Sequence, residues 1–216
     1  RLVDSELGEI PEGWRMICVA DVGKVICGKT PPTKVTEYYG DDVPFITIPD
    51  MHGKIFATTT QKKLSHVGAA SQKSKMLPAG AICVSCIATP GLVVITSQES
   101  QTNQQINTVI PREANETYFW FWVFRDLGNQ IKAGGSGGSV VTNLSTGRFS
   151  QLRVLAPPPS LRRFYSLLVK PLFERILTND KESRTLTALR DALLPKLISG
   201  ELRVKDAEQF LKERGL

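Results

Sequence analysis

Short apolar runs, each a few residues long and separated by turn residues, occupy the first 157 positions of the chain. The runs are rich in β-branched residues and are bounded by Gly, Pro, Asn or Asp, which is typical of strands. We therefore predict six strands, at residues 16–22, 43–48, 81–87, 92–96, 106–110 and 152–155.

One segment of this region departs from the strand pattern. From Tyr118 to Phe124 six of seven residues are aromatic, and the apolar pattern continues to Ile131. Thr117 can cap the start of a helix and Gly134 lies just beyond its end, so we predict a helix that is buried on most sides. A membrane segment and a platform for stacking bases are the alternatives, but the run is too short to span a bilayer.

The composition changes after Ala156, where three consecutive prolines form a stiff connector. A helical pattern follows, with no glycine until Gly200. Because Pro171 has no backbone N–H to continue a helix, we predict a short helix over 160–169 and a long helix over 171–198. The long helix would extend about 40 Å.

Apolar residues recur along this helical region on two heptad phases, and the centre of both phases is polar. Arg175, Asn179 and Glu182 occupy that centre. An apolar seam with a polar centre is how paired helices fix their register and partner. A long helix cannot bury such a seam against a small domain alone, so we predict a second helix along it; the alternative is a helix packed on its own domain. The predicted helix-pairing residues are Leu161, Leu168, Leu172, Leu186, Leu189 and Leu193.

These patterns together predict an α+β fold, in which a globular mixed domain is followed by a long α-helix that forms a coiled coil. We expect the globular domain over 1–157 and a helical spacer and dimerisation region over 158–200. A C-terminal tail over 201–216, with an amphipathic turn or two at 206–214, is expected to pack on the helical region.

The composition narrows the class of protein. The chain has 216 residues and 23.8 kDa, with 41% hydrophobic and 22% charged residues, as in globular proteins. No run reaches the roughly 20 apolar residues of a membrane helix, and the N-terminus lacks the features of a signal peptide. Four cysteines in such a chain indicate reduced thiols and a cytoplasmic location. The first residue is Arg1 rather than Met, as expected of a fragment or a processed form.

The distribution of charge favours an anionic partner. The net charge is +6 and the pI is about 9.2. Between Asp50 and Glu99 there is no acidic residue, and such a segment can follow a phosphate backbone, although a solvated lysine face is the alternative. The candidate phosphate contacts are Lys54, Lys62, Lys63, Lys73 and Lys75.

Residues 23–30 match the expression for a phosphate-binding P-loop, but their chemistry argues against that function. Val25 and Ile26 are β-branched and resist the unusual backbone angles of a phosphate cradle. Pro31 and Pro32 follow at once and remove two backbone donors where the cradle needs a helix N-terminus. We therefore do not expect nucleotide binding.

No other motif indicates catalysis, a cofactor or a metal. Cys83 and Cys86 form a lone CxxC pair, for which buried small hydrophobic residues are the better interpretation than zinc or redox chemistry. His52 and His66 lie in lysine-rich loops without a paired carboxylate or serine. We expect no cofactor and no catalytic residue.

The remaining candidates are elements of recognition. Three consecutive amides, Asn103, Gln104 and Gln105, are of the type that pairs with base edges, although amides also cap strands. A glycine-rich segment around Ser136 can bring bare N–H groups close to phosphates. Lys29 and Thr30, directed by the prolines that follow, form a second basic tip. All six residues are candidates for DNA binding.

Taken in order, these segments resemble the DNA-specificity subunit of type I restriction-modification systems. No motif is decisive alone, but the ordered set covers nearly the whole chain, and the last stretch is the most specific. The similar segments are LGEIPEGW (7–14), GKTP (28–31), YYGDDVPFI (38–46), NQQIN (103–107), GGSGG (134–138), LAPPP (155–159) and LRDALLPKLISGELRV (189–204).

The resemblance implies that residues 1–157 are a target-recognition domain for double-stranded DNA. It implies a protein without catalysis of its own, which positions methyltransferase (modification) subunits and, through the full complex, an endonuclease (restriction) subunit on a bipartite site. The family carries two recognition units whose helices pair antiparallel, whereas this sequence has one, so it is expected to be a fragment or a half-length form that dimerises. The stem after the prolines reads Leu161-Arg162-Arg163 where the family often has Glu-Gln.

The competing interpretation is an assembly protein that does not bind DNA and recruits partners through its coiled coil. The acid-free lysine interval between Asp50 and Glu99 disfavours it. Retention on DNA separates the DNA-specificity protein from the assembly protein. A third class, an enzyme that binds nucleoside triphosphates, is tested by nucleotide-dependent melting.

Overall fold

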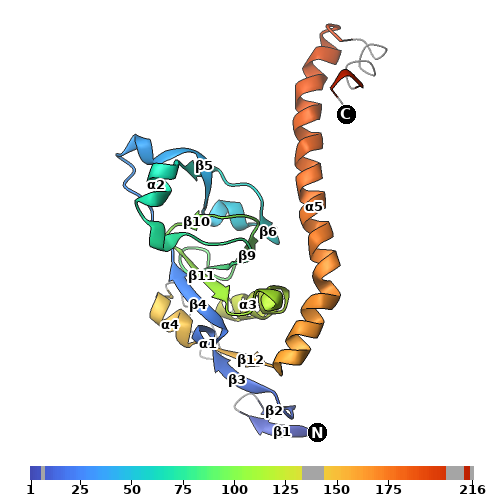
Figure 1. The fold of residues 1–216 in the computed structure, drawn as a ribbon. Helices are drawn as coiled ribbons and strands as arrows, with labels where there is room; N and C mark the ends of the chain where they lie inside the picture. The colour runs from blue at the N-terminus through green and yellow to red at the C-terminus, as the bar shows by residue number, and fades with distance from the viewer. Residues whose placement is uncertain (6–7, 133–143, 203–211, 215–216) are drawn as a thin grey trace. The chain divides into compact units, whose positions relative to one another are not determined.

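A computed structural model describes residues 1–5, 8–132, 144–202 and 212–214 of the chain (Figure 1). The chain divides into two compact units, Arg1–Phe173 and Glu174–Leu216. The first unit holds mixed sheets with helices on them and the second holds most of one long helix, so the predicted α+β fold class is confirmed.

A five-stranded sheet forms the centre of the first unit. Its strand order is β4-β11-β8-β9-β6, and all neighbours are antiparallel except the outer pair β9 and β6. The central strands are almost completely buried, which agrees with their β-branched sequences. The bounds are β4 Gly23–Cys27, β6 Phe56–Ala57, β8 Ile82–Ser85, β9 Val93–Thr96 and β11 Ile106–Pro111.

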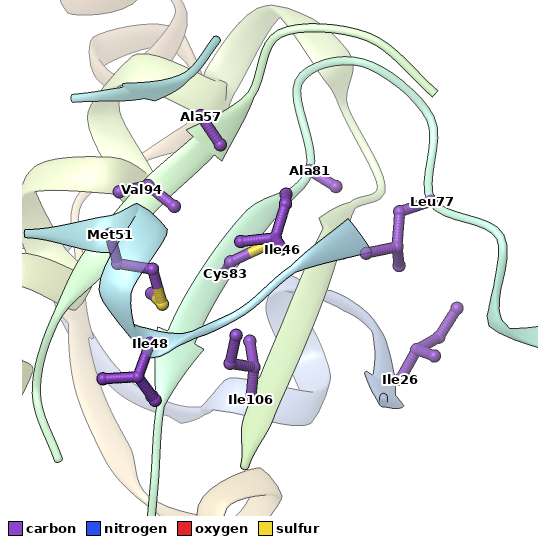
Figure 2. Close-up of a cluster of buried hydrophobic side chains, with 10 residues drawn as sticks. All are labelled: Ile26, Ile46, Ile48, Met51, Ala57, Leu77, Ala81, Cys83, Val94 and Ile106. Atoms are coloured by element: carbon purple, nitrogen blue, oxygen red, sulfur yellow. The ribbon is translucent and has the colours of Figure 1, made fainter. Parts of the chain in front are cut away.

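A three-stranded sheet packs beside it, in the order β10 (Gln101–Thr102), β5 (Tyr39–Ile46), β7 (Lys62–Leu64). Strand β5 serves two cores because successive side chains point to opposite faces. Phe45 packs with Leu64 and Ala69, whereas Ile46 points toward Cys83 of the larger sheet (Figure 2). The core in Figure 2 comprises Ile26, Ile46, Ile48, Met51, Ala57, Leu77, Ala81, Cys83, Val94 and Ile106.

Two small antiparallel ribbons complete the strands. One pairs β1 (Leu2–Ser5) with β2 (Gly8–Pro11). The other pairs β3 (Arg15–Cys18) with β12 (Arg153–Ala156), so a segment near the N-terminus lies beside the segment that leads into the long helix. The short helices α2 (His66–Ala70) and α4 (Thr146–Gln151) begin at the serine caps Ser65 and Ser145.

The predicted aromatic helix is confirmed as α3, Thr117–Lys132, which packs against β8 and β9. Trp120, Phe121 and Phe124 are buried, which identifies the run as core. Thr117, however, is the first helical residue rather than a cap, and its hydroxyl donates to the carbonyl of Gly80 at 3.3 Å. The Oγ of Ser166 instead accepts from the backbone N–H of Phe119 at 3.2 Å, so another helix supplies the cap.

That other helix is α5, Pro159–Ile198, and it is continuous where we predicted two helices. Pro171 lies inside it, where it leaves the carbonyl of Leu167 without a helical donor. Both residues are exposed, so water can hydrogen-bond that carbonyl and the helix tolerates the proline. On the opposite side Phe173 is buried and stacks on Tyr118 with ring centroids 4.3 Å apart.

Two predicted strands end earlier than their sequence pattern suggested, and an aspartate is the reason in both cases. Residues 19–22 form the helix α1 (Val19–Val22), where the Asp21 carboxylate accepts from the N–H of Cys18 at 2.9 Å. Strand β5 likewise stops at Ile46, and the buried Asp50 carboxylate accepts from the N–H of Thr47 at 2.8 Å. Each carboxylate caps a helical turn, and this stabilisation outweighs the preference of the β-branched residues for a strand.

The second unit comprises the rest of α5 and the residues after it. Gly200 has φ of 74°, the left-handed conformation that commonly follows the end of a helix. Leu202 then donates to the carbonyl of Lys196 at 3.0 Å, and Lys196 forms an ion pair with Glu201 at 3.6 Å. Most of the turn predicted at 206–214 lies outside the described residues. In the described part of the chain, no helix combines the length and apolar character needed to cross a membrane.

Candidate nucleic-acid interface

The two predicted recognition tips lie side by side at one end of the five-stranded sheet. Strand β4 runs antiparallel to β11 with Cys27 opposite Asn107, so the segment after β4 meets the segment before β11. Gly28 donates to the carbonyl of Ile106 at 3.1 Å, and Lys29 donates to the carbonyl of Thr102 at 2.9 Å. We call residues 28–30 together with residues 102–105 the recognition turn.

Only glycine can occupy position 28 of the recognition turn. A Cβ at Gly28 would collide with the carbonyl oxygens of Thr102 and Asn103 and with the Thr102 hydroxyl. The absence of a side chain therefore permits the two backbones to approach closely enough for their hydrogen bonds.

The three amides differ in what they bind. Asn103 is engaged within the turn, since its Nδ2 donates to Gln105 Oε1 at 2.9 Å and its Oδ1 accepts from the N–H of Gln105 at 3.2 Å. Gln104 is exposed, and its Oε1 accepts from the hydroxyl of Thr30 at 2.7 Å. The structure thus joins Thr30 to Gln104 directly, across 74 positions of sequence.

A buried pair of glutamines beneath the recognition turn holds it to the lysine-rich interval. Gln72 Nε2 donates to the carbonyl of Lys29 at 2.8 Å and to Gln101 Oε1 at 2.6 Å. Gln101 Nε2 in turn donates to the carbonyl of Ala69 at 2.9 Å. Sequence analysis missed both residues, because nothing local pairs position 72 with position 101.

The 3-10 turn that follows Gln72 carries two of the predicted lysines. This turn, η3, spans Lys73–Lys75, so Lys73 directly follows a residue bonded to Lys29. The structure therefore brings this basic turn next to the recognition turn.

Strand β7 carries two more lysines on the sheet that includes β10. Lys62, Phe45 and Gln101 are register partners across β7, β5 and β10. Since neighbouring strands lie about 4.8 Å apart, the Cα atoms of Lys62 and Gln101 are about 10 Å apart. Lys63 forms an ion pair with Asp41 at 3.7 Å, which offsets part of its charge. A cavity of about 480 Å³ borders both lysines and is also lined by Tyr39, Thr60 and Gln61.

Two predicted DNA-binding residues do not join this group. Lys54 is half-buried, and its ammonium donates to the hydroxyl of Thr59 at 3.0 Å, outside the network around Gln72. Ser136 lies outside the described residues, so its assignment stays a prediction.

The structure gives the P-loop match and the CxxC pair roles other than nucleotide or metal binding. Residues 23–27 of the P-loop match are strand β4, and no helix follows Thr30 directly. Burial raises the pKa of Cys83 to about 12 and that of Cys86 to about 11, so both thiols stay protonated near neutral pH. Within the described ranges no group of His, Cys, Asp and Glu side chains is arranged to hold a metal ion.

The predicted helix-pairing residues in the first unit lie on the face of α5 that points away from the domain core. Arg162, Ser166 and Phe173 face the domain, whereas Leu161, Leu168 and Leu172 are 44%, 65% and 64% exposed. In the second unit Leu186 is 65% exposed, and Leu189 and Leu193 are half-buried. Exposed leucines in such numbers are typical of a surface that takes part in an interaction.

Comparison with known proteins assigns this architecture. Residues 11–160 match the family model described as the type I restriction modification DNA specificity domain. The chain is 45% identical over 195 residues to the type I restriction enzyme HindI specificity subunit of Haemophilus influenzae, covering 89% of the chain and 42% of that relative. It is 24% identical over 187 residues to the MjaIX specificity subunit of Methanocaldococcus jannaschii, covering 85% of the chain and 43% of that relative.

Solved structures share the fold. The HsdS subunit of Thermoanaerobacter tengcongensis matches with a TM-score of 0.59 at 16% identity, over 92% of the chain and 48% of that subunit. The S subunit of the type I restriction-modification system of M. genitalium matches with a TM-score of 0.62 at 16% identity, over 86% and 46%. The chain therefore spans less than half the length of each of these proteins.

Proposed function

The chain belongs to the family of type I restriction-modification DNA specificity domains, and from this membership we propose that it recognises a specific sequence in double-stranded DNA. The observation that carries the proposal is the recognition turn. Gly28, Thr30 and Gln104 hold two segments distant in sequence together at the surface, and a buried glutamine pair fastens them to the basic turn η3.

The residues divide into those that position the DNA and those that read it. Phosphate contacts fix register and orientation but carry no sequence information, which suits flexible surface lysines. We assign this role to Lys54, Lys62, Lys63, Lys73 and Lys75. Base edges require rigidly held donors and acceptors, which the recognition turn and its neighbours supply. We assign this role to Lys29, Thr30, Asn103, Gln104 and Gln105, and keep Ser136 as a further candidate.

The partners follow from the relatives, which are named as specificity subunits of type I restriction enzymes. We assign the chain the same place: it brings methyltransferase subunits, and through the complex an endonuclease subunit, to a bipartite site without a reaction of its own. The division into a recognition domain at 1–157, a helical region at 158–200 and a tail at 201–216 is part of this proposal, and so is a cytoplasmic location.

A second recognition unit completes the bipartite site. The leucine face of α5 supports this, because exposed residues such as Leu172 and Leu186, two heptads apart, recur along it and need a covering helix. That helix comes from a tandem unit of the same protein or from a second copy of this chain. The length of the paired helices then sets the separation of the two half-sites.

Enrichment of a random duplex DNA library on the chain, with and without a cognate methyltransferase subunit, tests the proposal. A short motif is the expected result, and an inverted repeat with a fixed gap would indicate pairing of two copies. Gln104→Ala should change base preference at one position, whereas Gln98→Ala, an exposed glutamine outside the recognition turn, should not. No enriched motif in either condition would contradict DNA recognition and favour an assembly protein.

A further inference from the structure

In the recognition turn, the carbonyl groups of residues 102–105 each accept a hydrogen bond. The backbone carbonyls of Thr102, Asn103, Gln104 and Gln105 accept from Lys29, Ile106, Cys27 and Cys86, respectively. The side-chain oxygens of all three amides also accept hydrogen bonds, from Thr30 for Gln104, from Asn103 for Gln105, and from Gln105 for Asn103.

The hydrogen-bonding groups of the Gln104 and Gln105 side chains that stay unused are donors. The Nε2 groups of Gln104 and Gln105 donate to nothing among the described residues, and the Lys29 side chain is exposed beside them. Thr30 donates its single hydroxyl proton to Gln104 Oε1. This hydrogen bond orients the Gln104 amide so that its oxygen faces inward and its nitrogen outward.

The four bases present different patterns to such a surface in the major groove. Guanine offers two adjacent acceptors, N7 and O6, and thymine offers one, O4. Adenine places a donor, its N6 amine, beside N7, and cytosine offers only the N4 donor. A cluster of donors leaves an amine of adenine or cytosine unpaired, which costs affinity because the site is desolvated on binding.

Building on the proposed function, we propose that the recognition turn reads a guanine, with Gln104 as the specificity-determining residue and Lys29 and Gln105 as supporting donors. Thr30 is a positioning residue in this arrangement. An unrestrained glutamine pairs with adenine through both its oxygen and its nitrogen. By holding the oxygen inward, the Thr30 hydroxyl disfavours that two-point pairing and directs the amide nitrogen of the same side chain toward acceptors such as those of guanine.

Two near-isosteric variants separate these roles in the library experiment, carried out on the full chain with its methyltransferase subunit. Gln104→Glu keeps an oxygen for Thr30 but presents a second oxygen, so guanine preference at one position should fall about tenfold and cytosine or adenine should rise there. Thr30→Val frees the amide, so adenine should rise at that same position. Gln98→Ala should leave every position unchanged, and melting temperatures identify any variant that fails to fold.

Modified bases provide a measurement that does not depend on the variants. In the selected duplex, 7-deazaguanine lacks the N7 acceptor, and at the position read by Gln104 it should weaken binding of the unmodified chain about tenfold. Inosine lacks only the minor-groove amine and should leave binding unchanged.

The outcomes distinguish this inference from the proposed function. A selected motif without a guanine in it, or a guanine preference that survives both Gln104→Glu and 7-deazaguanine, would overturn the inference while leaving DNA recognition intact. Absence of any selected sequence would overturn both.

Discussion

The Nε of Arg162 in α5 donates to the carboxylate of Glu116, just before α3, at 2.7 Å, and both side chains are largely buried. The same carboxylate oxygen accepts from the indole of Trp120 at 3.1 Å, and the guanidinium also donates to the carbonyl of Pro157 at 2.7 Å. The other oxygen, Oε1, is buried without a partner among the described residues. This ion pair thus fastens the start of α5 to the aromatic helix.

Removing one member of this pair should be costly. Arg162→Met leaves the Glu116 charge buried and unpaired, and we expect a loss of about 3 kcal/mol in the free energy of unfolding, measured by chemical denaturation. Arg163→Met, an exposed neighbour, is the matched control and should cost little. The double variant Arg162→Met with Glu116→Gln should lose less than the sum of the single changes; strict additivity would contradict the pairing.

Gly28→Ala should separate the two segments of the recognition turn. Its Cβ would overlap the backbone of Thr102 and Asn103, and we expect a loss of about 1–3 kcal/mol in stability, together with weaker sequence preference in the library experiment. Gly147→Ala is the control, because a Cβ there meets no atom within 4 Å and the position is inside α4. It should be neutral or stabilising by up to about 1 kcal/mol.

Lys62→Ala should weaken binding to every DNA sequence alike. If its ammonium contacts a phosphate, the slope of log affinity against log salt should fall by about one. Lys62→Arg keeps the charge and should keep the slope, while Lys63→Ala should have a smaller effect because Asp41 already offsets that charge. A changed base preference in Lys62→Ala would instead indicate that this lysine reads a base edge.

Glutamate at two of the predicted helix-pairing leucines of the second unit should abolish self-association. Leu186→Glu with Leu193→Glu places charges in the predicted seam, and sedimentation equilibrium should then report a monomer where the parent chain forms a dimer. Thr187→Glu, on an exposed position beside Leu186, is the control and should leave the dimer intact. A monomeric parent chain would contradict pairing between two copies, and would leave a tandem unit as the source of the second helix.

The four thiols should fall into two classes. At pH 8 in the folded chain, a maleimide should modify the half-buried Cys18 and Cys27 but spare Cys83 and Cys86. With a pKa near 12 rather than 9, Cys83 has about a thousandfold less thiolate at this pH, besides being shielded from the reagent. Mass spectrometry of the labelled peptides, before and after unfolding in urea, checks the assignment.

The same shift in pKa has a consequence for alkaline stability. Between about pH 9 and 12 the unfolded chain loses a thiol proton that folded Cys83 keeps, so stability should fall as the pH rises through this range. Cys83→Ala removes this contribution and should reduce the dependence of the unfolding midpoint on pH, while the smaller contribution of Cys86 remains. An unchanged dependence would assign the alkaline loss to other groups.

The elements that sequence analysis found are those with a strong pattern of their own. Strands β8, β9 and β11 are runs rich in β-branched residues, and α3 is a long apolar run between a threonine and a glycine-rich segment. In the two main sheets, strands β4, β6, β7 and β10 were missed. Strands of two or three residues carry no period, and Lys62–Leu64 is defined only by its pairing with β5. The predicted helix break at Pro171 was wrong for a related reason. The local sequence does not show that water can hydrogen-bond the Leu167 carbonyl, which Pro171 leaves without a helical donor.

In the candidate site too, the sequence indicated the chemistry of single residues but not the long-range pairing that brings them together. The chemistry of Lys29, Thr30 and Gln104 was recognisable from residue type, but their assembly was not, because it depends on β4 lying beside β11. Gln72 and Gln101 gave no signal at all, since buried glutamines look like surface ones in sequence.

Backbone hydrogen bonds hold both ends of the recognition turn, so the side chain at position 104 between them can be exchanged. Thr102 and Ile106 are tied to Lys29 and Gly28 through backbone atoms alone, and the side chain at position 104 lies on the surface between them. Substitution at this one position exchanges a chemical group without altering a strand pair or the core. With Gln104 as the proposed base-reading residue, a single codon change there is expected to alter the target sequence, so a lineage would diversify its recognised sites by point mutation while the scaffold stays constant.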